Sequence, residues 1–357
     1  MKNWNQLFLG AALSFSLFAV SCSSDDDKGI EPPQGDFVNG YFVLNEGNFG
    51  ANNASVSFIG NDGTVQNNIF TAVNGTNLGD TAQSILLDDD KAYIIMNGSN
   101  SITIVNRYTF QHIGNISTGL MNPRFMEIEN GKAFVSNWGD PTNPNDDFIA
   151  VINLSTSSVD TTIPVAEGPE RMEKSNGKIY VAHLGGYGSG SSVTVINAAN
   201  NSISANISVG DLPNSLVEEN GILYVLCGGK PAWTGDETSG KLVLIHTSNN
   251  EVISTLDFPN AHPTQLVEDN GKLYYTIDSN VYSANLNLTS IPESPIFSMS
   301  GQGVFAAYAF EVEDGKIYVG DAGDFMSDGR VLVYTTSGVL ENTFDVGALP
   351  NGVYGND

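Results

Sequence analysis

The chain has 357 residues and a formal net charge of −26 at pH 7, from 40 acidic and 14 basic side chains. A surface this acidic repels nucleic acid and anionic lipid, so we do not expect binding to DNA, to RNA or to a membrane face. Charged residues make up only 15% of the sequence, and its richness in Asn, Ser, Thr and Gly is typical of a secreted, β-rich protein.

The N-terminal residues 1–21 are predicted to be a signal peptide. Lys2 precedes an apolar run, residues 7–20, which has the length of the hydrophobic region of a secretory signal and is short for a membrane-spanning helix. The run ends in "AVSC", which resembles a bacterial lipobox. This resemblance implies that Cys22 carries a lipid and becomes the mature N-terminus. The alternative is an ordinary signal peptide followed by an incidental cysteine.

Residues 22–36 follow as an acidic, proline-bearing segment with nothing to bury, so we expect a disordered tether. The "SSDDD" after Cys22 resembles the export signal of Bacteroidetes lipoproteins, which implies a lipid-anchored protein in the outer membrane, facing the cell exterior. A plain solvated linker is the alternative. With Cys22 occupied by lipid, Cys227 has no disulfide partner and is expected to be a small buried apolar residue.

Residues 37–357 contain a repeated hexapeptide, of which "NGKIYV" at 176–181 is the clearest copy. Successive copies are 41 to 51 residues apart. Seven units of this size match the four-stranded blades of a β-propeller, so the predicted fold class is all-β with seven antiparallel blades. The aromatic at the fifth position, which we call the marker aromatic, recurs as Tyr93, Phe134, Tyr180, Tyr224, Tyr274 and Tyr318, and Phe42 takes its place in the degenerate copy at 39–44.

The unit that starts at Gly177 shows the internal pattern of a blade. Its alternating segments, rich in β-branched and aromatic residues, predict strands, and the Asn-Gly pairs predict type I′ hairpin turns. No convincing amphipathic helix is expected in the body. The predicted strands are B (178–183), C (193–197), D (202–210) and, preceding the next Asn-Gly pair, A (212–219).

The two ends of residues 37–357 predict a closed ring. The C-terminal "ALPNGVYGND" reads as strand A of a blade and stops before any strand B. The N-terminal "GYFVLNEG" at 40–47 supplies a strand of the missing kind. Pairing the two shares one blade between both termini and hides the edges of the sheet.

Function is expected on the face that carries the B–C loops, because the A–B and C–D turns of the other face are short. A large aromatic in a polar loop has no local core, so it either fixes the loop or contacts a ligand. We predict ligand contacts from several of them and from Asp140 in the second loop. The five long loops are 45–54 with Phe49, 136–147 with Trp138, 182–192 with Tyr187, 227–240 with Trp233, and 320–330 with Phe325 and Met326.

Polar residues at the start of strand A are expected at the mouth of the central channel. The predicted ligand-binding set is Arg124, Arg171, Asn214 and Gln265. Capping of the channel through bound water is the alternative role for these side chains.

The sequence contains no nucleophile elbow, phosphate-binding loop, zinc-protease motif or cysteine pair. Its four histidines lack the spacing of a metal site. Asp321, Asp324 and Asp328 could hold Ca²⁺, but they do not match the EF-hand pattern, so we favour solvated loop carboxylates. We therefore expect no cofactor and no catalytic residue.

The segment "YVAHLGGYGSGSSVTVINAANNSISANISVGDLP" is similar to the YVTN-type propeller repeat, and this resemblance covers essentially 37–357. With the lipoprotein-like start and the opening "LNEGNFGANNASVSFI", the chain resembles Bacteroidetes surface lipoproteins of the cobalamin-capturing BtuG family. The resemblance implies a non-enzymatic protein that captures a large polar ligand such as cobalamin. It also implies a TonB-dependent outer-membrane transporter as partner. No single ligand contact is carried over from that family.

Two other functions stay open at the level of the sequence. A lactonase- or esterase-like propeller enzyme would need a metal in the channel, for which Glu127, Glu170, Asn214 and Asn351 are the nearest candidates, without regular spacing. A protein-docking or adhesion scaffold would bind no small molecule and would not depend on the loop aromatics.

Overall fold

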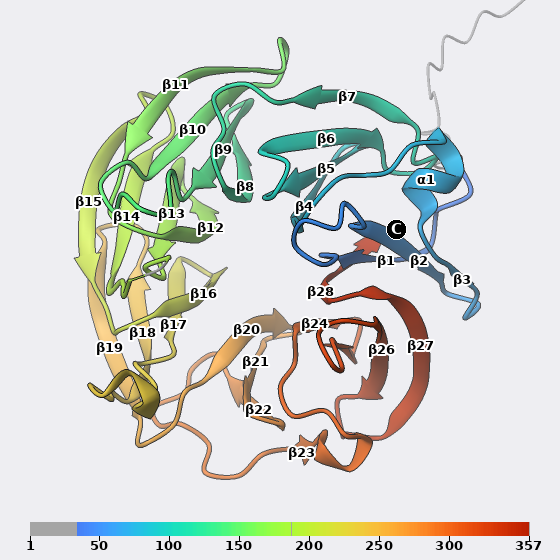
Figure 1. The fold of residues 1–357 in the computed structure, drawn as a ribbon. Coiled ribbons are helices and arrows are strands. Elements are labelled where there is room, and N and C mark those ends of the chain that lie inside the picture. Colours follow the sequence, from blue (N-terminus) through green and yellow to red (C-terminus); the bar gives the residue numbers. More distant parts are fainter. Residues whose placement is uncertain (1–33, 187, 357) are drawn as a thin grey trace, which may run out of the picture. The chain divides into compact units, whose positions relative to one another are not determined.

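The computed structural model describes residues 34–186 and 188–356, which form seven four-stranded antiparallel sheets. Figure 1 shows the sheets arranged as blades around a central axis. The protein is therefore a seven-bladed β-propeller, as the repeats predict. The predicted signal peptide, Cys22 and the tether up to residue 33 lie outside the described residues. Among the described residues, no helix is long and apolar enough to cross a lipid bilayer.

Each blade runs from an inner strand at the channel to an outer strand. The first three are β28 (Pro350–Asn356), β1 (Gly40–Asn45), β2 (Ser55–Gly60), β3 (Val65–Gln66); β4 (Ala82–Asp88), β5 (Lys91–Met96), β6 (Ser101–Asn106), β7 (His112–Ile116); and β8 (Pro123–Glu129), β9 (Lys132–Asn137), β10 (Phe148–Asn153), β11 (Ser158–Pro164). The next two are β12 (Pro169–Ser175), β13 (Lys178–His183), β14 (Ser192–Asn197), β15 (Ser202–Ser208); and β16 (Pro213–Glu219), β17 (Ile222–Cys227), β18 (Gly240–His246), β19 (Glu251–Phe258). The last two are β20 (Thr264–Asp269), β21 (Lys272–Ile277), β22 (Asn280–Asn285), β23 (Phe297–Ser298); and β24 (Ala309–Glu313), β25 (Lys316–Asp321), β26 (Asp328–Thr335), β27 (Leu340–Ala348). Three short helical segments are α1 (Ile69–Asn74), η1 (Ala232–Thr234) and η2 (Ser300–Gln302).

The ring closes where the two ends of the body meet. Strand β1 pairs with β2 on one side and with the C-terminal β28 on the other, with Phe42 opposite Tyr354. The predicted closure is confirmed, because the C-terminal strand β28 completes the blade to which β1, β2 and β3 belong.

The Asn-Gly pairs form the tight turns between strands A and B. Both residues of each pair have positive φ, which is the requirement of a type I′ turn. Asparagine tolerates this left-handed conformation and glycine adopts it without a Cβ penalty. The pairs with this geometry are Asn130-Gly131, Asn176-Gly177, Asn220-Gly221, Asn270-Gly271 and, with aspartate in the first place, Asp314-Gly315.

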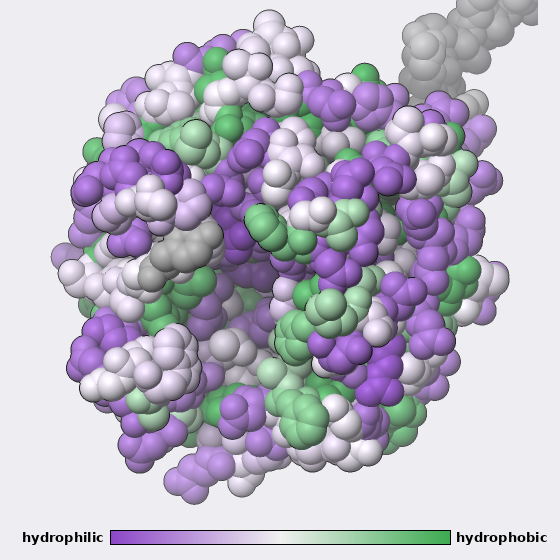
Figure 2. All heavy atoms as spheres, viewed as in Figure 1, coloured by the Kyte–Doolittle hydropathy of each residue, from purple (hydrophilic) through white to green (hydrophobic). Residues whose placement is uncertain are grey.

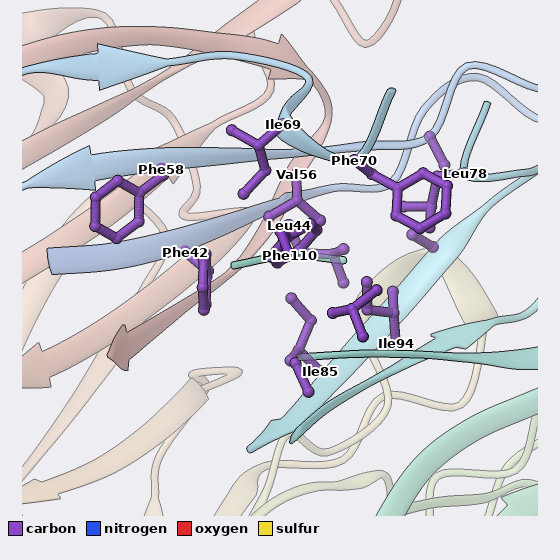
Figure 3. Close-up of a cluster of buried hydrophobic side chains, with 14 of the residues drawn as sticks. Phe42, Leu44, Val56, Phe58, Ile69, Phe70, Leu78, Ile85, Ile94 and Phe110 are labelled. Carbon is purple, nitrogen blue, oxygen red and sulfur yellow. The ribbon is translucent and has the colours of Figure 1, made fainter. Parts of the chain in front are cut away.

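The marker aromatics are buried between neighbouring blades, as predicted for scaffold residues. Phe42 of β1 lies in one apolar cluster with Ile85 and Ile94 of the following blade (Figure 3). Tyr180 of β13 likewise packs with Leu216 of the blade after its own. Burying a ring this size stabilises each seam by several kcal/mol relative to alanine, about 3–5 for Phe. Cys227 is also fully buried, as expected.

The lysine of the hexapeptide adds a second link across two of the seams. Lys178 donates hydrogen bonds to the Thr247 carbonyl (2.6 Å) and to Asn250 Oδ1 (3.1 Å), both in the C–D turn of the next blade. Lys132 reaches the Ala198 carbonyl of its following blade in the same way (3.1 Å). The motif thus encodes a turn, a strand and a contact to the next blade.

The body contains one short α-helix, although no amphipathic helix was expected. Helix α1 links β3 to β4 and buries Ile69 and Phe70 against the cluster that contains Phe110 (Figure 3). Its apolar residues are adjacent and do not recur at helical spacing, so the sequence pattern does not reveal it. A segment this short is not stable as an isolated helix, so α1 depends on its packing against the blade.

Candidate functional site

The central channel contains a cavity of about 700 Å³. Figure 2 shows the molecule hollowed at its centre, with hydrophilic residues deep in the hollow. The walls come from the inner strands, so each blade contributes side chains from the start of its strand A. The predicted residues Arg124, Arg171, Asn214 and Gln265 all line this cavity.

Arg124 is held by two partners at the channel wall. Its guanidinium donates from Nε and Nη2 to the two carboxylate oxygens of Glu170, at 2.9 and 2.8 Å. The side chains are only 15% and 8% exposed, so this is a largely buried bidentate ion pair. The centroid of the Trp138 ring lies 4.0 Å from the guanidinium carbon of Arg124, within the range of a cation–π contact.

Trp138 therefore fixes its loop to the channel wall in this structure. Its indole N–H also donates to the Pro169 carbonyl (3.1 Å). Asp140, two residues on, is exposed and accepts hydrogen bonds from the amide and hydroxyl of Thr142, which lower the pKa of its carboxyl. Trp138 and Asp140 line a separate hollow of about 200 Å³ rather than the central cavity.

The predicted amides link one blade to the next around the channel. Asn214 Nδ2 donates to the Pro263 carbonyl (3.0 Å), and Gln265 Nε2 donates to the Tyr308 carbonyl (3.4 Å). Asn351 Nδ2 likewise donates a hydrogen bond to the Ala82 carbonyl (2.8 Å). These donors belong to the scaffold, and the Asn214 oxygen also accepts a hydrogen bond from the Ser215 hydroxyl (2.8 Å).

Four aromatic side chains on the long-loop face are strongly exposed, and we call them the rim aromatics. Phe49 is 87% exposed, Trp233 86%, Phe305 84% and Phe325 57%. Phe325 also meets the ring of Tyr308 edge-on at 5.6 Å, which places it beside the cavity wall. The predicted residue Tyr187 lies outside the described residues.

Phe305 was not predicted from the sequence. It lies in the link between η2 and β24, whereas aromatic ligand contacts were predicted only in the loops between strands B and C. The available signal was an aromatic in the small-residue segment "GQGVFAA", residues 301–307. Links between strands D and A share a face with the long loops, so Phe305 joins the same rim.

Three glutamates deeper along the inner strands have perturbed acidity. Each is paired across its hairpin with a marker aromatic: Glu127 with Phe134, Glu173 with Tyr180, and Glu311 with Tyr318. Burial raises the pKa of Glu173 to about 8, and the charge of Glu127 adds to this effect. Burial also raises the pKa values of Glu127 and Glu311 to about 7. A large fraction of these carboxyls is therefore neutral near pH 7.

Glu46, which follows β1, is a further cavity residue that the sequence did not single out. Its carboxylate accepts a hydrogen bond from the Tyr308 hydroxyl. Burial raises the pKa of Glu46, while the hydrogen bond and the positive charge of Arg124 oppose that rise.

The candidate calcium ligands are engaged by their own blade. Asp321 forms an ion pair with Arg330 (2.8 Å), and Asp324 accepts hydrogen bonds from the amides of Met326 and Ser327. Within residues 34–186 and 188–356, no group of three His, Cys, Asp or Glu side chains is placed to hold a metal ion. Of the candidate ligands of a channel metal, Glu170 has both oxygens bonded to Arg124.

The sequence itself matches a protein family. Residues 39–230, more than half of the chain, fit the family described as a domain of unknown function, DUF5074. The chain belongs to this family. A comparison with curated proteins found no match.

Solved structures share the fold at low sequence identity. A quinonprotein alcohol dehydrogenase-like protein from Bacteroides thetaiotaomicron is 16% identical with a TM-score of 0.67, over 90% of this chain and 79% of that one. A functionally unknown protein from Desulfotomaculum acetoxidans is 15% identical with a TM-score of 0.65, over 89% and 100% of the two chains. Hydrazine synthase from Kuenenia stuttgartiensis is 13% identical with a TM-score of 0.58, over 74% and 86%. At these identities the similarity shows the fold alone.

Proposed function

We propose that this DUF5074 protein is a non-enzymatic lipoprotein that captures a large polar ligand on the cell surface and passes it to a TonB-dependent outer-membrane transporter. Cobalamin is the first candidate ligand. The rim aromatics around a polar channel carry this proposal, with Phe49 and Trp233 more than four-fifths exposed. Large apolar rings at such exposure are costly to leave in water and are characteristic of binding surfaces.

The shape of the site favours a ligand that covers the rim and enters the channel mouth. A cavity of about 700 Å³ lies within the usual range for small-molecule sites. Stacking on the rim aromatics would supply contact area, and the polar cavity wall would fix orientation. The lipid anchor, the surface location and the transporter partner rest on the lipoprotein-like N-terminus and on the resemblance of residues 37–357.

The ligand is tested by titrating the protein with cobalamin and following the absorbance of the corrin. We expect affinity in the nanomolar range or tighter, weakened about tenfold or more by Trp233→Ala or Phe49→Ala, because central aromatic contacts dominate such interfaces. Ile253→Ala is the matched control, since this exposed apolar residue lies on the outer strand β19. Absence of binding at micromolar protein would rule out cobalamin.

The transporter partner is tested separately. A TonB-dependent receptor encoded beside this gene should copurify with the protein after mild detergent extraction. Copurification that survives removal of the rim aromatics would show that the ligand face is not the docking face. Failure of any such receptor to copurify would count against this part of the proposal.

A further inference from the structure

One arginine differs from the others in how its guanidinium is used. Arg171 makes no hydrogen bond and no ion pair with any residue that the structure describes, and its guanidinium contacts an aromatic ring. The other three arginines all donate hydrogen bonds to side-chain acceptors: Arg107 to Asn356, Arg124 to Glu170, and Arg330 to Asp321. Arg171 nevertheless lines the central cavity.

A local irregularity of the inner strand directs Arg171 into the channel. Along a regular strand, neighbouring side chains point to opposite faces. In β12 the register shifts between Pro169 and Met172, so the two intervening residues face a single residue of β13. Glu170 and Arg171 consequently both line the cavity.

An aromatic ring of the neighbouring blade contacts the guanidinium. The guanidinium carbon of Arg171 lies 4.7 Å from the ring centroid of Phe125 in β8. This cation–π contact uses none of the N–H donors of the guanidinium, and none of them forms a hydrogen bond with a described residue. An oriented guanidinium with free donors is suited to bidentate binding of an oxyanion.

Among the described residues, no carboxylate around the cavity forms an ion pair or a hydrogen bond with Arg171, although the charge of Arg171 lowers the pKa of the Glu311 carboxyl. Glu268 instead accepts a hydrogen bond from the Gly271 amide (2.7 Å). Glu170 is bonded to Arg124, Glu46 to Tyr308, and Glu218 to the Gly221 amide (2.9 Å). Burial raises the pKa of Glu173 to about 8 and that of Glu311 to about 7, so both are substantially protonated near neutral pH. A charge left in a cavity without a close counter-ion is expensive unless a ligand supplies one.

We propose that Arg171 is the anion-binding residue of the channel and holds a carboxylate or phosphate group of the captured ligand. This inference rests on the proposed function in that the channel receives part of the ligand. Carboxylate and phosphate share the oxygen pair that a guanidinium recognises. The ligand class is thereby narrowed to polar molecules that carry an oxyanion.

The test measures binding of two probe anions, inorganic phosphate and succinate, by isothermal titration calorimetry at constant ionic strength. Wild-type protein should bind at least one of them, and Arg171→Gln should weaken that binding about tenfold or more. Lys272→Gln removes the same charge from an exposed position in β21 and should leave the affinity unchanged within about twofold. The stronger of the two probes identifies the group that the site takes.

Two results would overturn the inference. One is that neither anion binds the wild-type protein in the millimolar range; the other is that Arg171→Gln binds as tightly as wild type. Arg171→Lys keeps the positive charge but loses the bidentate donor geometry of the guanidinium, so it should bind the anion more weakly than wild type and more tightly than Arg171→Gln. Because Arg171 has no bonded partner, all three proteins should melt at nearly the same temperature, which separates lost binding from lost folding.

The outcome is distinguishable from that of the proposed function. If cobalamin binds and depends on Trp233 while neither anion binds, Arg171 is not the anion site and ligand capture stands. If the anions bind through Arg171 and cobalamin does not, the inferred site stands and the proposed ligand is wrong.

Discussion

Removing Arg124 should destabilise the propeller strongly, because it leaves a buried carboxylate without its counter-ion. The Arg124–Glu170 pair is bidentate, with donor–acceptor distances of 2.8 and 2.9 Å, and both side chains are less than one-fifth exposed. Breaking a buried pair from one side costs about 3–5 kcal/mol. Loss of the cation–π contact with Trp138 adds about 0.5–2 kcal/mol. We therefore expect Arg124→Met to lower the free energy of unfolding by roughly 4–6 kcal/mol.

Urea unfolding at pH 7, followed by circular dichroism, measures this change. The double variant Arg124→Met/Glu170→Met should cost less than Arg124→Met alone, since no buried charge is left without a partner. A cost below about 1 kcal/mol for Arg124→Met would refute the reasoning. So would single-variant costs that simply add in the double variant, because additivity means that the two side chains do not interact.

Three further predictions concern stability. Burial raises the pKa of Glu173 from 4.5 to about 8, so the folded protein holds this proton more tightly than the unfolded chain does. The contribution of Glu173 to the free energy of unfolding is therefore full below pH 4.5 and falls as the pH rises to 8. Melting temperatures between pH 5 and 8 should therefore fall less steeply in Glu173→Gln, and an unchanged slope would contradict this. Lys178→Met loses the hydrogen bond to the Thr247 carbonyl across a blade seam and should cost about 1–3 kcal/mol in urea unfolding. An unchanged free energy of unfolding would show that this contact does not stabilise the seam. Gly221→Ala places a Cβ on a residue with φ 81° and should cost about 1 kcal/mol by the same measurement. Gly301→Ala is the control and should be nearly neutral, because Gly301 has open space around it and no positive φ. Equal effects of the two substitutions would argue against backbone strain at Gly221.

The candidate site was predicted in outline but not in its contacts. The sequence placed Arg124, Arg171, Asn214 and Gln265 at the channel, and the structure brings all four to one cavity. It did not reveal that Arg124 is bonded to Glu170 or that the two amides bridge to the next blade. These partners are about 43 to 49 residues away along the chain, so no local pattern links them.

The positions of the loop aromatics were likewise predicted from the sequence, but their contacts were not. The sequence located Phe49, Trp138, Trp233 and Phe325 in long loops, but four similar signals have different outcomes. Trp138 packs on Arg124, whereas the other three remain largely exposed. Whether an aromatic in a loop finds a partner depends on which neighbouring blade presents a complementary group, and that is a property of the closed ring.

The sequence alone determined the number of blades, the order of their strands, the type I′ turns and the sharing of one blade between the two ends. Each of these follows from a local or periodic signal, since alternation, Asn-Gly pairs and a marker aromatic act within one hairpin or recur at the spacing of a blade. Only the tertiary structure decided which polar groups satisfy one another and which remain free for a ligand. Arg171 is the clearest case, because its proposed role depends on a register shift in β12, on the Phe125 ring of the preceding blade and on the carboxyls that ring closure brings around the channel.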